Sequence, residues 1–167
     1  MYKYWFAFLL LIIISLKTDS KSIKKETIVG KVVAITDGDT FKLLTKDSTL
    51  IKVRLADIDC PERKQPFSKR AKQFASDAVF SKTVTLNVLK KDRYRRYISH
   101  VIYDDSLSLS HELIKNGLAW HYRKYSNDSL LQALEDEART NKVGLWQDQN
   151  AIAPWVWRDL QKKKSKE

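Results

Sequence analysis

Residues 35–62 of the chain read ITDGDTFKLLTKDSTLIKVRLADIDCPE, a segment in which acidic side chains lie at the ends of two apolar runs. The runs, residues 41–44 and 51–55, alternate and contain β-branched side chains, which is typical of strands. If these strands pair antiparallel, Asp39 at the start of the first lies near Asp59, just past the end of the second. Gathered carboxylates need a positive partner, and a hard divalent cation with oxygen ligands is the usual one. The segment therefore predicts a metal site.

Each acidic loop also has a simpler interpretation when it is taken alone. Asp37-Gly38 is a common turn dipeptide, and residues 59–62 could form a solvated loop stiffened by Pro61. The chain is basic, however, with 31 Lys and Arg against 20 Asp and Glu. A basic protein that places acids at the ends of two adjacent strands, with Arg54 inside the second, favours a functional site over two unrelated turns.

Further short motifs follow along the chain in a characteristic order. They are Asp37-Gly38-Asp39-Thr40, Val53-Arg54-Leu55 with Ile58-Asp59 and Pro61-Glu62, Asp92-Arg93-Tyr94 followed by Arg96, Gly117-Leu118-Ala119-Trp120, and Gly144-Leu145-Trp146. In order and spacing, from about Thr27 to Trp157, they resemble the staphylococcal (micrococcal) nuclease-like family of phosphodiesterases. This coverage makes the resemblance far more specific than any single motif.

Composition along the chain predicts five strands and three helices. The expected strands are residues 27–35, 40–44, 50–55, 83–88 and 97–103. The expected helices are residues 65–81, with an apolar stripe of Phe67, Ala71, Phe74 and Ala78, then residues 109–116, closed by Gly117, and a third over residues 130–138. This layout predicts an α+β fold, mainly a β barrel, of the OB type. The family resemblance implies the same fold.

Length and charge limit the organisation and the partners. A chain of 167 residues has room for one ordinary domain. We expect this domain at residues 26–158, followed by a basic, disordered tail at residues 159–167. A net charge of +11 points to a polyanionic partner, either nucleic acid or an anionic membrane surface. The single cysteine, Cys60, excludes an internal disulfide, and we expect a monomer.

The first residues have the pattern of a targeting segment. Lys3 precedes an apolar run over residues 5–16, and polar residues 17–25 follow, as in a secretory signal. The run is shorter than the roughly 20 residues that cross a membrane. We expect residues 1–20 to be a signal peptide cleaved near Ser20, or else an uncleaved N-terminal anchor. The protein would then be secreted or periplasmic, and membrane-anchored only if the segment is retained.

The candidate site residues suit phosphodiester hydrolysis, which needs cations directed at the nonbridging oxygens and a base for water. Asp39 and Asp59 can hold a hard cation that acts as a Lewis acid. Arg54 and Arg96 would supply forked donors to the phosphate, a geometry that lysine cannot match.

The resemblance adds roles that the residue types alone do not give. It implies that the main-chain carbonyl of Cys60 is a further metal ligand and that Glu62 is the base or water-orienting residue. It also implies Ca²⁺ as cofactor, DNA and RNA as substrates, and products with a 5′-hydroxyl and a 3′-phosphate. Two positions depart from the family pattern: Arg95 and Asp57 both stand where the family usually has glycine, which puts loop geometry and efficiency in doubt.

Aromatic residues among cations suggest where the substrate is held. Arg93 and Tyr94 lie in the connection before Arg96, where a ring can stack on a base while the charges meet phosphate. Tyr122 and Tyr125 are candidates for a second contact of this kind.

Two other classes of function remain open at this point. A non-catalytic OB module could bind single strands through its basic and aromatic loops, but it has no need of the acids. A protein of the membrane surface could use the N-terminal run and the basic tail, and it explains neither acidic loop.

Overall fold

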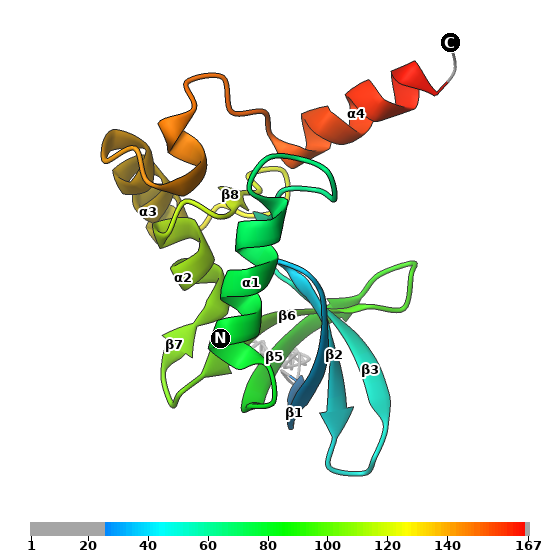
Figure 1. The fold of residues 1–167 in the computed structure, drawn as a ribbon. Coiled ribbons are helices and arrows are strands. Elements are labelled where there is room, and N and C mark those ends of the chain that lie inside the picture. Colours follow the sequence, from blue (N-terminus) through cyan, green and yellow to red (C-terminus); the bar gives the residue numbers. More distant parts are fainter. Residues whose placement is uncertain (1–25, 166–167) are drawn as a thin grey trace, which may run out of the picture.

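The computed structural model describes residues 26–165, and five of its strands close into a barrel (Figure 1). These strands are β1 (Glu26–Asp37), β2 (Thr40–Thr45), β3 (Leu50–Leu55), β5 (Thr83–Lys91) and β6 (Tyr97–Tyr103). They follow the order β3-β2-β1-β5-β6, and the parallel pairing of β3 with β6 completes the circle. The predicted five-stranded barrel is confirmed.

The barrel interior is filled by alternate side chains of its strands, as the period of two requires. In the antiparallel pair β2 and β3, Phe41 lies opposite Val53 and Leu43 opposite Ile51, and all four are buried. The same register places Thr40 opposite Arg54. The predicted antiparallel pairing is thus present, and it brings the start of β2 beside the end of β3.

Three helices pack beside the barrel close to where they were predicted. They are α1 (Ser68–Val79), α2 (Leu109–Lys115) and α3 (Ser129–Thr140). The fully buried line of α1 is Ala71, Ala75 and Val79, and the other members of the expected stripe, Phe67, Phe74 and Ala78, are partly buried against the same core. Gly117 ends α2 with a positive φ of 59°, the left-handed conformation expected for it.

Shorter elements complete the described chain. They are β4 (Ile58–Asp59), which pairs with β8 (Trp120–His121), then β7 (Leu107–Ser108) at the edge of β6, and a 3₁₀ turn, η1 (Gly144–Gln147). The pairing of β4 with β8 ties the second acidic loop to the segment that carries Tyr122.

A fourth helix, α4 (Pro154–Lys164), was not predicted. The expected count of three helices is therefore wrong, and the tail expected to be disordered from residue 159 is helical up to Lys164. Pro154 occupies the first turn, where its fixed φ favours a helix start. Ala153 belongs to the buried cluster around Trp120, and Trp155 packs against the ring of Trp120, so tertiary contacts stabilise a helix that the charged composition alone does not suggest. Figure 1 shows α4 leading away from the body of the domain.

The expected signal peptide or anchor, residues 1–20, lies outside the described residues. Within residues 26–165, no helix is both long and apolar enough to cross a membrane.

Candidate active site

Asp39 and Asp59 meet at one guanidinium, that of Arg54. Nη1 of Arg54 lies 3.0 Å from Oδ2 of Asp39, and Nη2 lies 2.7 Å from Oδ1 of Asp59. Asp39 precedes β2, Arg54 lies in β3 and Asp59 ends β4, so three strand ends supply the cluster. Both carboxylates are buried, with 7% and 2% of the residue exposed. The proximity predicted for the two acids is therefore present.

Arg54 is fixed from several directions. Its Nη1 also donates hydrogen bonds to the carbonyl oxygens of Leu55, at 3.1 Å, and Ile58, at 3.0 Å. Burial opposes its charge, but Asp39 and Asp59 outweigh that effect and raise the pKa of the Arg54 guanidinium. Arg54 is therefore a permanent cation whose fork is already aimed at the acids.

The loop around Cys60 is held against Asp39. The backbone N–H of Cys60 donates to Oδ2 of Asp39 at 2.9 Å. Gly38 is required by space, because a Cβ there would lie 2.8 Å from Cβ of Ala71 in α1 and 3.0 Å from Sγ of Cys60. Burial raises the pKa of the Cys60 thiol well above its usual value, which leaves it protonated and unsuited to act as a nucleophile.

Glu62 joins this cluster through a residue that the sequence did not reveal, Arg158 of α4. Nη2 of Arg158 lies 2.8 Å from Oδ2 of Asp59, and its Nη1 donates to Oε1 of Glu62. Burial opposes the charge of Arg158, but hydrogen bonds to Asp59 and Glu62 prevail and raise its pKa. No local motif marks Arg158. The sequence feature that could have indicated it is Pro154 followed by Trp155, which is typical of a helix start whose aromatic side chain packs on the domain.

The cluster keeps an excess of negative character despite the two arginines. Burial, the largest effect, raises the pKa of Asp59 above its usual value even though Arg54 and Arg158 act in the opposite direction. Burial and the neighbouring carboxylates of Asp39 and Glu62 raise the pKa of Asp37. Such crowding of acids is what a bound cation would relieve.

Arg96 belongs to a second cluster in the hairpin between β5 and β6. Its Nε and Nη2 both lie 2.8 Å from Oδ2 of Asp92, so its guanidinium is held by that acid. Tyr94 is exposed, and the guanidinium carbons of Arg93 and Arg96 lie 4.8 and 5.5 Å from the centre of its ring. Arg96 is two residues from Ile98, which pairs with Arg54. Arg96 therefore lies in the hairpin, one residue before β6, and its side chain is held by Asp92 rather than by the acids around Arg54.

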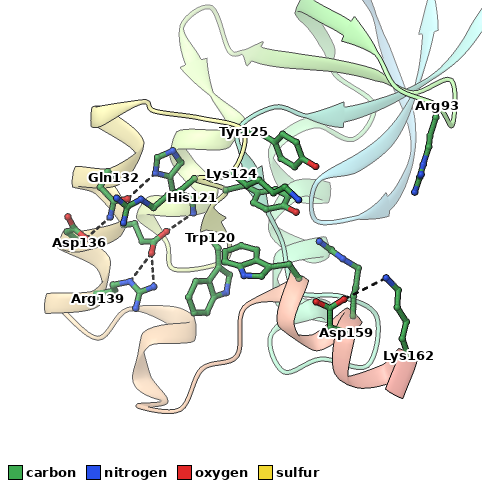
Figure 2. Close-up of a pocket in the computed structure, with 15 residues that line it drawn as sticks. Arg93, Trp120, His121, Lys124, Tyr125, Gln132, Asp136, Arg139, Asp159 and Lys162 are labelled. Atoms are coloured by element: carbon green, nitrogen blue, oxygen red, sulfur yellow. Dashed lines mark hydrogen bonds and ion pairs between the residues drawn. The ribbon is translucent and has the colours of Figure 1, made fainter. Parts of the chain in front are cut away.

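Three of the four predicted substrate-contacting residues line one pocket of about 850 Å³, namely Arg93, Tyr122 and Tyr125. Figure 2 shows Arg93 entering from the β5–β6 hairpin and Lys162 from α4. Tyr125 is 62% exposed. The ring of Tyr122 instead lies flat against Trp155 of α4, with centroids 5.0 Å apart and an interplanar angle of 2°. One face of Tyr122 is therefore already covered.

Asp57 and Arg95, the two departures from the family pattern, both have left-handed backbones, with φ of 67° and 62°. Glycine adopts this conformation without steric strain, which explains why it is usual at these positions. Oδ2 of Asp57 lies 2.6 Å from Nε2 of His100, so this acid has a partner in β6. Among the described residues, no comparable contact explains arginine at position 95.

The donors at the cluster suit a hard cation. Within the described part of the chain, no three side chains of His, Cys, Asp and Glu gather as a preformed metal centre. The predicted ligand set differs from such a centre, because it consists of two carboxylates and the Cys60 carbonyl, with water completing the shell. Oxygen donors without thiolate or imidazole match calcium or magnesium rather than zinc.

Comparison with known proteins identifies the family. Residues 52–148 match the family described as "Staphylococcal nuclease homologue". A Haemophilus influenzae protein named "Uncharacterized endonuclease" is 42% identical over 132 residues, covering 79% of this chain and 74% of that protein. A Shigella flexneri protein named "Micrococcal nuclease" is 39% identical over 144 residues, covering 80% and 82%. The acidic cluster at the rim of the barrel and these matches lead to one conclusion: the chain belongs to the staphylococcal nuclease family.

Proposed function

We propose that this endonuclease of the staphylococcal nuclease family depends on calcium, cuts both DNA and RNA, and leaves 3′-phosphate and 5′-hydroxyl ends. The observation that carries the proposal is the convergence of Asp39 and Asp59 on Arg54 at the rim of the barrel. A module that only binds strands has no use for two buried acids on one arginine.

The proposed roles follow from the chemistry of each group. Asp39, Asp59 and the Cys60 carbonyl would hold Ca²⁺, which when bound supplies a Lewis acid for a phosphate oxygen. Arg54 would donate forked hydrogen bonds to the phosphate, because its geometry and permanent charge suit an oxyanion. Arg96 would act in the same way from the hairpin between β5 and β6. Glu62 would accept a proton from the attacking water.

The substrate would lie along the pocket next to this cluster. Arg93, Tyr122 and Tyr125 line it, and Tyr94 is exposed at the hairpin. Rings that offer faces to bases, with cations for the backbone, favour single-stranded or locally opened nucleic acid. The net charge of +11 supports a polyanionic substrate.

The test is digestion of plasmid DNA and of RNA with Ca²⁺, and then with a chelator, using wild type, Glu62→Gln and Glu137→Gln. Glu137 is exposed on α3, so its variant makes the same charge change outside the site. Glu62→Gln should lower turnover by roughly 10²- to 10⁴-fold, as expected for loss of a general base, while strand binding persists. Glu137→Gln should act like wild type.

Two results would oppose the proposal in different ways. Intact substrates with every metal would reject the hydrolase itself. Undiminished turnover by Glu62→Gln would leave the hydrolase standing and remove Glu62 from its assigned role.

We also propose that the protein acts outside the cytoplasm and as a monomer. The pattern of residues 1–20 supports export. Mass spectrometry of the N-terminus of protein recovered from medium, periplasm and membranes would separate cleavage from anchoring. Light scattering of the purified protein would give the oligomeric state.

A further inference from the structure

Helix α4 reaches the acid cluster through a single side chain, Arg158. The Nη atoms of Arg158 contact both oxygens of Asp59, at 3.4 and 2.8 Å, and one of them also contacts Glu62. Asp59 is the proposed metal ligand and Glu62 the proposed base. A cation from the chain itself therefore occupies the carboxylates that a metal would need.

Both carboxylate oxygens of Asp59 are already in use. Oδ1 accepts from Arg54 at 2.7 Å, and Oδ2 accepts from Arg158 at 2.8 Å. The Asp59 side chain is only 2% exposed, so the two guanidinium groups and the surrounding chain cover it. The most direct way for a dication to reach Asp59 is to displace one of the two guanidinium groups.

Arg158 is the one free to withdraw. The Arg54 side chain is 12% exposed and is also bonded to Asp39 and two backbone carbonyls. The Arg158 side chain is 35% exposed, and among residues 26–165 its guanidinium makes polar contacts with Asp59 and Glu62 only. Moving Arg158 into solvent therefore breaks fewer contacts than moving Arg54.

The helix itself need not move when Arg158 does. Trp155, one turn before Arg158, packs edge-on against Trp120 at 5.9 Å and flat against Tyr122 at 5.0 Å. Ala153 is buried in the same cluster. These apolar contacts do not depend on Arg158, so a change of side-chain rotamer is sufficient to free the acids.

We propose that Arg158 is a further functional residue of this site, an internal competitor that occupies Asp59 and Glu62 and yields them to a divalent cation. The inference rests on the proposed calcium site and adds a residue that sets its affinity. Positive charges that bind the same carboxylate oxygens exclude each other, so every contact of Arg158 with the acids weakens the binding of the metal. The metal-free site is then held in a closed state in which Arg158 offsets part of the negative charge of the acids.

The test is isothermal titration of the full-length protein with CaCl₂, without nucleic acid, for wild type, Arg158→Gln and Lys163→Gln. Arg158→Gln keeps hydrogen-bonding ability but removes the charge, and should tighten Ca²⁺ binding roughly tenfold, since charge-assisted hydrogen bonds to the acids are lost from the competing state. Lys163 is exposed on the same helix. Its variant makes the same charge change and should shift the affinity less than about twofold, because charges exposed to solvent are screened.

The outcomes separate this inference from the proposed function. If Arg158→Gln binds Ca²⁺ no more tightly than Lys163→Gln while wild type still cuts with Ca²⁺, the competitor role is rejected and the nuclease proposal stands. If neither wild type nor Arg158→Gln binds Ca²⁺, both are rejected.

A measurement on wild type guards against a variant that fails to fold. The Nε–Hε NMR signal of Arg158, assigned by its loss in Arg158→Lys, should move toward the position of a solvent-exposed arginine when Ca²⁺ saturates the protein. Arg139 pairs with Glu135 at 2.7 Å, so its signal serves as the reference and should stay in place. An Arg158 signal that does not respond to Ca²⁺ would overturn the proposal.

Discussion

Arg95 is a non-glycine residue in a left-handed conformation, with φ of 62°. This conformation costs an L-residue about 1–2 kcal/mol, and glycine avoids the penalty but loses more freedom on folding. Arg95→Gly should therefore raise the free energy of unfolding by about 0.5 kcal/mol. Urea denaturation monitored by tryptophan fluorescence measures this difference.

Asp57→Gly is the matched control, because Asp57 has a similar φ of 67° but contacts His100 at 2.6 Å. In Asp57→Gly, the relief of backbone strain is offset by loss of the contact with His100, so the free energy of unfolding should not rise. Equal stabilisation by both variants would show that the contact with His100 contributes nothing.

The residues of the acid cluster differ in how far sequence could reveal them. The proximity of Asp39, Arg54 and Asp59 can be predicted from strand pairing. Two strands with alternating apolar residues and a short connection pair antiparallel, and this fixes which of their ends lie together. Arg158 is 99 positions from Asp59 and carries no pattern of its own. Its partner depends on where a whole helix docks, and no local rule gives that.

At the scale of elements, the hairpin between β5 and β6 is organised by Asp92. Oδ1 of Asp92 accepts from the backbone N–H groups of Tyr94 and Arg96, both at 2.9 Å, and Oδ2 pairs with the Arg96 side chain. Burial acts against the charged carboxylate, but its bonds to Arg96 prevail and lower the pKa of Asp92 below its ordinary 3.8. The acid thus sets both the turn and the direction of Arg96.

Asp92→Asn should lower the free energy of unfolding by about 1 kcal/mol at neutral pH, because a hydrogen bond to a charged group contributes about 1.5–3 kcal/mol and solvent reduces this for partly exposed side chains. Because the folded-state pKa is lowered, this stabilisation is present above pH 3.8 and is lost as the pH falls through the folded-state pKa. Denaturation curves at neutral pH and below pH 3.8 measure the difference in the free energy of unfolding between wild type and Asp92→Asn. If this difference is the same in acid as at neutral pH, the stabilisation does not come from the charge of Asp92.

The elements that sequence predicted are those with a regular apolar pattern. Strands β1, β2, β3, β5 and β6 and helices α1, α2 and α3 each bury a stripe of the expected period. Helix α4 has no such stripe, since Pro154 is its one buried residue. Its charged second half resembles a disordered tail in composition, and the helix is stabilised by contacts with the rest of the domain, among them the packing of Trp155 and the ion pairs of Arg158.

At the scale of the whole molecule, barrel closure brings a negative site to the surface of a positive protein. The chain carries a net charge of +11, yet Asp37, Asp39, Asp59 and Glu62 gather near one rim. A distribution of this kind attracts a polyanion overall and a cation locally. It also means that the folded state holds carboxylates together that the unfolded chain keeps apart.

Ca²⁺ should therefore stabilise the folded protein. A ligand bound only by the folded state adds about 2.7 kcal/mol to the free energy of unfolding at a concentration 100-fold above its dissociation constant. For a domain of this size, that corresponds to a rise in Tm of roughly 5–10 °C. Asp59→Asn should abolish this rise in Tm, because it removes one of the two carboxylates that are proposed to bind Ca²⁺. Calorimetry with and without CaCl₂ measures the difference within each protein.

Asp104→Asn provides the comparison for this effect. Asp104 pairs with Lys82 at 2.6 Å, in the turn that follows β6, so its variant removes one acid without touching the cluster. It should keep the full response to Ca²⁺. If Asp59→Asn responds as strongly as Asp104→Asn, the stabilising ion binds elsewhere on the protein, and the assignment of Asp59 as a metal ligand fails.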